Sequence, residues 1–349
     1  MSASDAAGAP VPIEADSSHA AQMVQLLNTA FLLQALYAAT ELGLADLVTD
    51  GAKTPDDLAR ATGAHGPSLH RLLRMLAGNG VFREEEGGRF TLTPLAATLR
   101  VDSPVSVRDW ARWVCGPDTW AVWGDLLHAV RTGEPAFAHT HGKPYYAYLA
   151  DHPDLAGAFG RWMTAQSRLH NAALVSAYDF SRFGTVVDVG GGQGATLAAI
   201  LEAYPAVRGI LLDQPTVVAQ TPPLATAEMA GRCTIVGGDA RQSVPAGGDC
   251  YVVKRLLMEQ PDDGAIAILR NCAEAMTAGG RVLVVEMVIP PTNEPAAGKT
   301  YDVIMLATFS GGRIRTEAEL RTLFASAGLV LTSVIPTSSP NFIVEGVRG

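Results

Sequence analysis

The sequence predicts an α/β fold in which a doubly wound, seven-stranded sheet domain follows a helical domain of winged-helix pattern. After residue 185, seven short runs rich in valine, isoleucine and leucine alternate with helical segments, which is typical of strands buried on both faces. Before residue 105, apolar residues instead recur at helical spacing. With 349 residues and 48% hydrophobic content, the chain is long enough to bury two cores.

Composition excludes several classes of protein. A formal net charge of −9 opposes binding to the phosphates of nucleic acids, which requires clustered cations. No apolar run approaches the roughly 20 residues needed to span a bilayer. The first 18 residues have neither a basic start nor an apolar core, so they do not resemble a secretory signal. The sequence therefore predicts a cytoplasmic protein with no membrane or nucleic-acid partner, and a disordered leader at residues 1–18.

Residues 19–105 are predicted to form the winged-helix domain. Two apolar-periodic helical segments occupy residues 20–49. Thr54 is a predicted N-cap with Pro55 at the first helical position, and a further helix begins at Gly66. A strand pair within VFREEEGGRFTLT completes the pattern of helices followed by a two-stranded wing.

The winged-helix pattern also raises the alternative of a DNA-binding regulator. Its recognition helix would offer only Arg71 and Arg74, and residues 20–49 contain no lysine or arginine. Those residues are so apolar that burial against a second copy of the chain is their natural outcome. We therefore expect this domain to form an intertwined homodimer that also closes each active site.

A helical segment rich in aromatic residues, 106–180, is predicted to link the two domains and to line a pocket. All five tryptophans lie in it: Trp110, Trp113, Trp120, Trp123 and Trp162. Core packing and contacts between helices explain some of them, and an aromatic ligand slot is an equally reasonable explanation for others. The sequence leaves both interpretations open.

Residues 181–349 hold the seven predicted strands. In chain order, these are TVVDVGG, RGILLDQ, CTIVGGD, CYVVKRLL, GRVLVVEMVI, VLTSVIPT and FIVEGVR. Helical segments lie between most of them, as parallel pairing requires. No helix separates the last two strands, so we expect them to form an antiparallel hairpin at one edge of the sheet.

A glycine-rich turn follows the first of these strands, in VVDVGGGQGATLAAILEAYP. Gly190, Gly192 and Gly194 allow the backbone to approach a ligand closely, and the start of the next helix favours a carboxylate or phosphate. In the dinucleotide fingerprint the last glycine would stand at Ala195, which is a tolerated variant. The turn alone therefore does not separate a nicotinamide dinucleotide from S-adenosylmethionine.

Acidic residues at three consecutive strand ends distinguish the two cofactors. Asp188 lies inside the turn motif, where it would face the methionine ammonium group. Asp213 ends the second strand, where it would accept hydrogen bonds from both ribose hydroxyls, and Asp239 ends the third, where it suits the adenine amino group. Because S-adenosylmethionine carries an ammonium group and no pyrophosphate, the three acids favour it as the cofactor.

With these motifs in order, the chain resembles the class I S-adenosylmethionine-dependent methyltransferases, specifically the plant caffeate-type and bacterial antibiotic-tailoring small-molecule O-methyltransferases. The motifs are DVGGGQG, LLDQPTVV, GDARQSVPAGGDCYVVKRLL, AGGRVLVVEMVIP, YDVIMLA and FSGGRIRTEAEL. The resemblance covers nearly everything after residue 20. It implies a Rossmann-like methyltransferase domain at 181–349 and a dimerising winged-helix domain at 19–105.

The resemblance also implies two sets of binding residues. The predicted cofactor set is Asp188, Gly190, Gly192, Gly194, Asp213, Gln214, Asp239, Ala240, Lys254 and Ser167. The set predicted to lie along an aromatic or polyketide-derived small molecule is Trp113, Phe159, Trp162, Met163, Met258, Met305 and Phe309.

The chain departs from the family at the catalytic base. Members that depend on a histidine carry it at the position of Met258 and hold it between two glutamates. Glu286 keeps the first glutamate, whereas Ile314 replaces the second. Ala240 also replaces a bulky residue beside the adenine. Loss of the base together with one of its orienting acids indicates that the histidine mechanism was abandoned.

Few residues remain as catalytic candidates. None of the eight histidines lies beyond residue 170, so the predicted methyltransferase domain contains no imidazole. His170 stands seven residues after Met163, two turns along the same helical face, and could reach the pocket. The candidates are therefore Glu286, His170 and Glu259, of which Glu259 fits a solvated or structural role more readily. Because no His/Asp cluster stands at Met258, no metal is predicted.

Two reactions remain open. In the first, S-adenosylmethionine methylates an acidic hydroxyl, or a carbon, of an aromatic or polyketide-derived secondary metabolite, mainly by proximity and without a histidine base. In the second, the charge of the cofactor serves a non-methylating tailoring reaction, because other members of the family cyclise, hydroxylate or decarboxylate their substrates.

Overall fold

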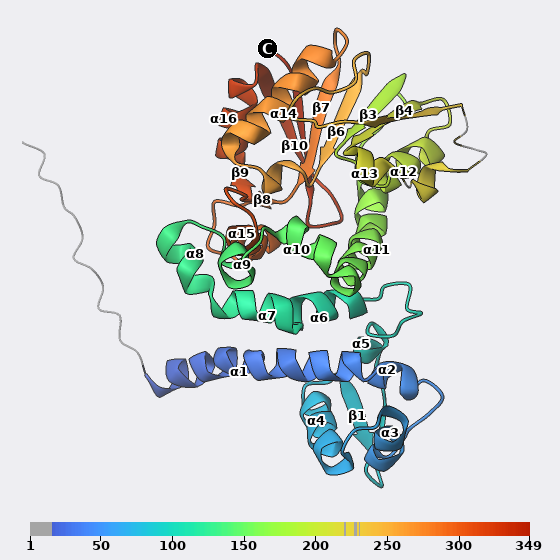
Figure 1. Cartoon of the computed structure of the whole chain (residues 1–349), viewed down its shortest axis with the longest axis vertical. Helices are drawn as coiled ribbons and strands as arrows, with labels where there is room; N and C mark the ends of the chain where they lie inside the picture. Colours follow the sequence, from blue (N-terminus) through green and yellow to red (C-terminus); the bar gives the residue numbers. More distant parts are fainter. Residues whose placement is uncertain (1–15, 220, 227–228, 230) are drawn as a thin grey trace, which may run out of the picture. The chain divides into compact units, whose positions relative to one another are not determined.

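The computed structural model describes residues 16–219, 221–226, 229 and 231–349, which divide into two compact units after Gly116 (Figure 1). This division falls inside the segment 106–180, and the predicted domain boundaries remain predictions. Residues 1–15 of the predicted leader lie outside the described residues. Residues 17 and 18 of the predicted leader are instead helical, because the Asp16 carboxylate accepts hydrogen bonds from the N–H groups of Ser18 and His19.

The first unit combines helices with a two-stranded wing. Its elements are α1 (Ser17–Glu41), α2 (Leu44–Leu47), α3 (Pro55–Thr62), α4 (Gly66–Gly78), β1 (Phe82–Glu85), β2 (Arg89–Leu92), α5 (Pro94–Ala97) and α6 (Arg108–Cys115). The Thr54 hydroxyl accepts from the N–H of Asp57 at 3.1 Å, so the predicted cap of α3 is confirmed. β1 pairs antiparallel with β2. The helices and wing predicted from the sequence are therefore both present.

Helix α1 leaves much of its apolar surface uncovered. Met23, Leu26, Leu27 and Phe31 are each more than half exposed. By length and composition alone, α1 is apolar enough to cross a membrane. The prediction that no apolar run approaches membrane-spanning length was therefore wrong. The few polar residues scattered through α1 do not lower its mean hydropathy below that of a membrane-spanning helix. An uncovered apolar face of this size indicates a surface that a partner molecule covers.

The second unit is built on a seven-stranded mixed sheet of order β10-β11-β7-β6-β3-β4-β5. Its strands are β3 (Thr185–Val189), β4 (Arg208–Asp213), β5 (Cys233–Gly237), β6 (Cys250–Lys254), β7 (Arg281–Glu286), β10 (Leu329–Pro336) and β11 (Phe342–Arg348). The five strands from β7 to β5 run parallel, whereas β11 is antiparallel to both β7 and β10. All seven predicted strands and the C-terminal hairpin are confirmed.

Helices cover both faces of this sheet (Figure 1). Val187 and Val189 of β3 point to the face covered by α14 (Asp262–Ala275) and α16 (Glu317–Ser326). The intervening Val186 points to the opposite face, covered by α11 (Pro153–Ala177) and α12 (Ala195–Ala203). Burial on both faces explains why these strands are continuous apolar runs rather than alternating ones.

The remaining helices of this unit are mostly short. They are α7 (Pro117–Gly124), α8 (Leu126–Thr132), α9 (Ala136–His141), α10 (Tyr145–Asp151), α13 (Pro215–Val218), α15 (Ala297–Thr308) and the 3-10 turns η1 (Pro222–Leu224) and η2 (Leu257–Glu259). The predicted strand at 280–289 is interrupted at Met287. Its end forms a separate strand, β8 (Val288–Ile289), which pairs with β9 (Arg315–Thr316).

Candidate active site

The parallel strands end at one edge of the sheet, where open α/β folds bind their ligands. Asp188 is the penultimate residue of β3, Asp213 ends β4 and Lys254 ends β6, while Asp239 follows β5. The fold therefore brings together predicted cofactor residues from four strands that lie far apart in the sequence.

The glycine-rich turn connects β3 to α12. Gly192 has a φ of 61°, and its N–H donates to Oδ2 of Asp213 at 2.8 Å. Gly194 is the N-cap of α12 with a φ of 86°, and a Cβ there would lie 2.4 Å from Cδ1 of Leu224. A Cβ at Gly192 would meet nothing within 4 Å. The turn therefore requires glycine at positions 192 and 194 for its conformation. It also leaves open space beside Gly192, next to the start of α12.

Asp188 and Lys254 form a buried pair of opposite charges behind this turn. Asp188 is fully buried, and neither of its carboxylate oxygens has a well-aligned hydrogen-bond partner in the described part of the chain. Burial raises the pKa of Asp188, and the charge of Lys254 and the nearby N–H of Leu197 oppose that rise. Lys254 donates from Nζ to the hydroxyls of Thr196 at 3.2 Å and Ser167 at 3.4 Å, and burial lowers the pKa of Lys254. A buried carboxylate with so few donors is costly. The ammonium group of S-adenosylmethionine would supply donors, so these residues fit that cofactor.

The other two acids have partners already. Asp213 accepts the N–H of the exposed Gln214 at 2.7 Å. Asp239 pairs with the Arg241 guanidinium at 2.8 Å, and this hydrogen bond lowers the pKa of Asp239. An ion pair this accessible is worth about 1 kcal/mol at most, so a ligand can compete for the carboxylate. The half-buried Ala240 packs against the sheet core beside it.

Met258 occupies the position of the family's histidine base. It lies buried in η2, and its N–H donates to Oε1 of Glu286 at 2.9 Å. Burial raises the pKa of Glu286 to about 7. Ile314 is also buried, and its N–H donates to the Asp302 carboxylate at 2.9 Å. Glu286 therefore holds the backbone of the turn, instead of orienting a side chain at position 258.

Glu259, the next residue, pairs with Tyr146 of α10. The Tyr146 hydroxyl lies 2.9 Å and 3.1 Å from the two carboxylate oxygens. Burial raises the pKa of Glu259 to about 7, and the negative charges of Glu286 and Asp213 add to the rise. A carboxyl group that titrates near neutral pH is suited to accepting a proton. Tyr146 was not predicted, because it lies 113 residues before its partner.

His170 belongs to a cluster that we call the polar cluster, made of Gln166, His170, Arg255 and Tyr301. Gln166 donates from Nε2 to the Tyr301 hydroxyl at 3.2 Å, and the Arg255 guanidinium lies 5.3 Å from the centre of the Tyr301 ring. Burial, followed by the charges of Arg255 and Lys254, lowers the pKa of His170 to about 4. His170 is therefore neutral at physiological pH and a weak base. Gln166, Arg255 and Tyr301 were not predicted as site residues.

Two other histidines of this unit have partners away from the strand ends. His139 pairs with the Asp125 carboxylate at 2.6 Å, and Nε2 of His141 lies 3.0 Å from the carbonyl oxygen of Asp118. No group of three or more His, Cys, Asp or Glu side chains is placed to hold a metal ion within the described residues.

Aromatic side chains from three helical segments meet at Tyr145, which the sequence did not single out. The Tyr145 ring lies 5.4 Å from Phe159 of α11 and 5.6 Å from Phe309 at the end of α15. Of the other predicted substrate residues in this unit, Met305 is buried on α15, and Trp162 and Met163 are half-buried on α11. Trp113 lies in α6 of the first unit, where it stacks on Trp110 at 5.1 Å, so its predicted role remains a prediction.

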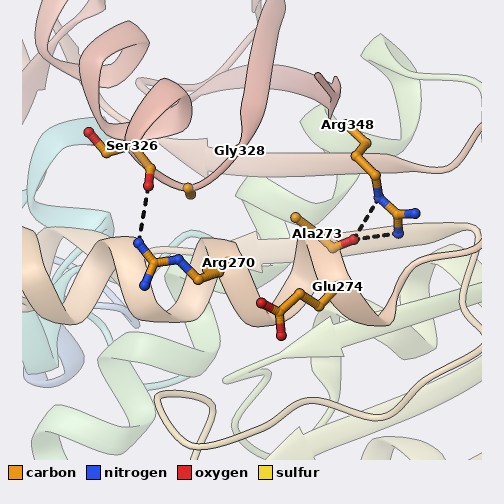
Figure 2. A pocket seen from close by; sticks show the side chains of 7 residues that line it. Arg270, Ala273, Glu274, Ser326, Gly328 and Arg348 are labelled. Atoms are coloured by element: carbon orange, nitrogen blue, oxygen red, sulfur yellow. Dashed lines mark hydrogen bonds between the residues drawn. The ribbon is translucent and has the colours of Figure 1, made fainter.

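A separate pocket of about 500 Å³ is lined by residues of α14, of the end of α16 and of the end of β11 (Figure 2). Its lining residues are Arg270, Ala273, Glu274, Ser326, Ala327, Gly328 and Arg348. Arg348 donates to the carbonyl of Ala273 at 3.0 Å, and Arg270 donates to that of Ser326 at 3.2 Å. None of these residues is a predicted site residue, whereas the predicted cofactor residues meet at the strand ends, so the strand-end site described above is the candidate active site.

Comparison with known proteins identifies the family. The family described as O-methyltransferase domain matches residues 123–330, and the O-methyltransferase dimerisation domain matches residues 24–102. The chain is similar to "Phenazine O-methyltransferase PhzM" of Lysobacter antibioticus, with 45% identity over 93% of this chain and 94% of that protein. It is also similar to "Mitomycin biosynthesis 6-O-methyltransferase" of Streptomyces lavendulae, with 36% identity over 92% of both chains.

A solved structure carries the same architecture. The fold superimposes on that of CalO1, a "Methyltransferase in Calicheamicin Biosynthesis" in its SAH-bound form, with a TM-score of 0.85, 38% identity and coverage of 96% of this chain and 100% of the other. These relatives are named for methyl transfer, so neither the non-methylating reactions nor the DNA-binding regulator is favoured. The chain belongs to the O-methyltransferase family and is an S-adenosylmethionine-dependent methyltransferase.

Proposed function

We propose that this enzyme methylates an acidic hydroxyl, or a carbon, of an aromatic or polyketide-derived secondary metabolite, and that it does so mainly by proximity. The buried Met258 at the base position carries this proposal, because neither its side chain nor the backbone-bound Glu286 can act as a histidine base would. The relatives named for phenazine and mitomycin methylation support the choice of acceptor class.

The cofactor residues have distinct tasks in this proposal. When bound, S-adenosylmethionine supplies an electrophilic methyl group. Asp188 would hold its ammonium group, Asp213 its ribose hydroxyls and Asp239 its adenine amino group. Lys254 lines the far side of the pocket, where Ser167 and Thr196 fix its ammonium group. The remaining members of the predicted cofactor set, which include Gln214 and Ala240, provide backbone and apolar contacts.

The acceptor would be held among the aromatic side chains around Tyr145. Fixing it at near-attack distance can contribute several kcal/mol, up to about 7–11 in the best cases. Glu259 is placed to accept the remaining proton, because its pKa of about 7 matches an acidic phenol or enol. The neutral His170 would contact the acceptor rather than deprotonate it, because its pKa is low.

We also propose that the enzyme works as a cytoplasmic homodimer that requires no nucleic acid or membrane. The match of residues 24–102 to a dimerisation domain supports this assembly. The exposed apolar side chains of α1 supply a surface that a second copy would bury.

Methyl transfer is tested by incubating the enzyme with 1-hydroxyphenazine, or a hydroxynaphthoate, and S-adenosylmethionine that carries a deuterated methyl group. Mass spectrometry should find the label on the acceptor. An unlabelled isomer or an oxidised product would contradict the proposal. Calorimetry of S-adenosylhomocysteine with wild type and Asp213→Ala gives the cofactor control, in which the variant should bind at least about tenfold more weakly, as the loss of charge-assisted hydrogen bonds implies.

A further inference from the structure

We infer that the polar cluster of Gln166, His170, Arg255 and Tyr301 is a subsite for an aromatic carboxylate that carries a hydroxyl or amino group on the adjacent ring carbon. The inference rests on the proposed function, because it narrows the class of acceptor for the same site. It is carried by three buried polar atoms that have no partner, by the backbone conformation of Arg255, and by the chemistry of these unpaired donor and acceptor groups.

The unpartnered atoms come from three side chains of the cluster. Nη1 of Arg255, Oε1 of Gln166 and Nδ1 of His170 are buried, and none has a hydrogen-bond partner in the described part of the chain. Gln166 is 8% exposed and His170 6%. An unpaired buried polar atom destabilises the folded protein, so three in one cluster indicate a site that a ligand completes.

The three groups lie on elements that face one another. Gln166 and His170 are four residues apart on α11 and therefore share a helix face. Gln166 bonds to Tyr301 of α15, and the Arg255 guanidinium lies over the ring of the same tyrosine. Tyr301 thus ties α11, α15 and the end of β6 into one cluster.

The backbone of Arg255 is strained. Arg255 has a φ of 53°, and it is the one non-glycine residue with a positive φ among those that the structure describes. Such a conformation is unfavourable and persists where the surroundings impose it. The N–H of Arg255 donates to the carbonyl of Val285 at 3.1 Å, which fixes this turn next to Lys254 at the strand-end edge.

The chemistry of the cluster defines its ligand. A guanidinium group is a planar donor that matches a carboxylate. Arg255 forms no ion pair within the described residues, although the charges of Glu259 and Glu286 are close enough to interact with it. Oε1 of Gln166 can only accept a hydrogen bond. A ligand that satisfies both must carry an anionic acceptor next to an O–H or N–H donor. Nδ1 of His170 can take either role according to its tautomer.

A pair of probes that differ by one carboxylate tests this inference by binding alone. With saturating S-adenosylhomocysteine present, isothermal calorimetry should find that the wild type binds 1-hydroxy-2-naphthoate at least tenfold more tightly than 1-naphthol. Arg255→Leu should reduce that ratio below about threefold, without changing the affinity for 1-naphthol or S-adenosylhomocysteine. Gln166→Glu keeps the size of the side chain and adds a like charge, so it should reduce the ratio in the same way.

The control removes an arginine outside the cluster. Arg313→Leu, at an exposed arginine whose side chain pairs with Asp262, should keep the wild-type ratio. Equal affinities in the wild type, failure of both probes to bind, or a ratio that survives both cluster variants would overturn the inference. Failure of the wild type to bind S-adenosylhomocysteine would instead overturn the proposed function on which the subsite rests.

Discussion

At the scale of single residues, we propose that Glu259, paired with Tyr146, accepts the proton of the acceptor in place of a histidine. The carboxylate is the proton-accepting form, and it becomes populated as the pH rises through its pKa of about 7. We therefore expect kcat for a phenolic acceptor to increase with pH and to level off above that value. Glu259→Gln should abolish this inflection and lower kcat at pH 8 by about 10²-fold, the lower end of the usual contribution of a general base.

Tyr146→Phe tests the same inflection through the hydrogen bond to Glu259. The Tyr146 hydroxyl donates to the carboxylate and lowers the pKa of Glu259. Its removal should shift the inflection to higher pH without abolishing it. Glu286 has a similar pKa, so Glu286→Gln is the control and should retain the inflection. A profile that is unchanged in Glu259→Gln would leave proximity to an already ionised acceptor as the whole mechanism.

At the scale of elements, the turn that carries Met258 and Glu259 is held by one buried arginine. Arg315 is 1% exposed, and it donates to the carbonyls of Leu257 at 2.9 Å and Gln260 at 3.0 Å as well as to the Asp262 carboxylate at 2.9 Å. Arg315→Leu leaves the carbonyls of Leu257 and Gln260 without this partner, at about 2 kcal/mol each, whereas the half-exposed Asp262 keeps its pair with Arg313. For a unit of this size, we expect Arg315→Leu to lower the Tm by about 8–16 °C and to reduce kcat.

The neighbouring Arg313 offers a matched control for this stability prediction. Its side chain is 42% exposed and pairs with the same Asp262 carboxylate at 2.6 Å. Exposed pairs contribute about 1 kcal/mol at most, so Arg313→Leu should change the Tm by no more than about 4 °C. Differential scanning fluorimetry measures both variants. Equal shifts would show that burial of Arg315 does not decide the stability of the turn.

The sequence predicted the helices and strands better than it predicted which side chains contact one another. The seven strands were found because β3 and its neighbours are buried on both faces, which imposes continuous apolar runs. The Thr54 cap was found because capping depends on adjacent residues alone. Tyr146 and Arg255 could not be predicted as site residues. Tyr146 stands out only through a partner 113 residues away, and Arg255 only through an unusual backbone conformation.

The sequence predicted Glu286 as a catalytic candidate, at the position of the family's first orienting glutamate, but it did not predict what the Glu286 carboxylate contacts. In the structure, that carboxylate accepts the backbone N–H of Met258. That contact depends on how η2 is folded, which no residue pattern in MEQPDD specifies.

At the scale of the whole molecule, the exposed apolar side chains of α1 decide how the enzyme assembles. Leu27 and Phe31, one helical turn apart, are 65% and 67% exposed, and the family dimerisation domain covers both positions. Light scattering at micromolar concentration should therefore give twice the mass of one chain for the wild type. The double variant Leu27→Asp with Phe31→Asp should be monomeric, because a dimer would have to bury two unpaired charges per chain. Val330→Asp, at a 53% exposed valine on the edge strand β10, is the control and should remain dimeric.

A helix as apolar as α1 also has the composition to enter a lipid phase. Flotation with phosphatidylcholine vesicles therefore separates membrane binding from dimerisation. A wild-type monomer that floats with the vesicles would assign this face to a membrane, whereas a dimer that stays in the aqueous fraction assigns it to a second copy of the chain.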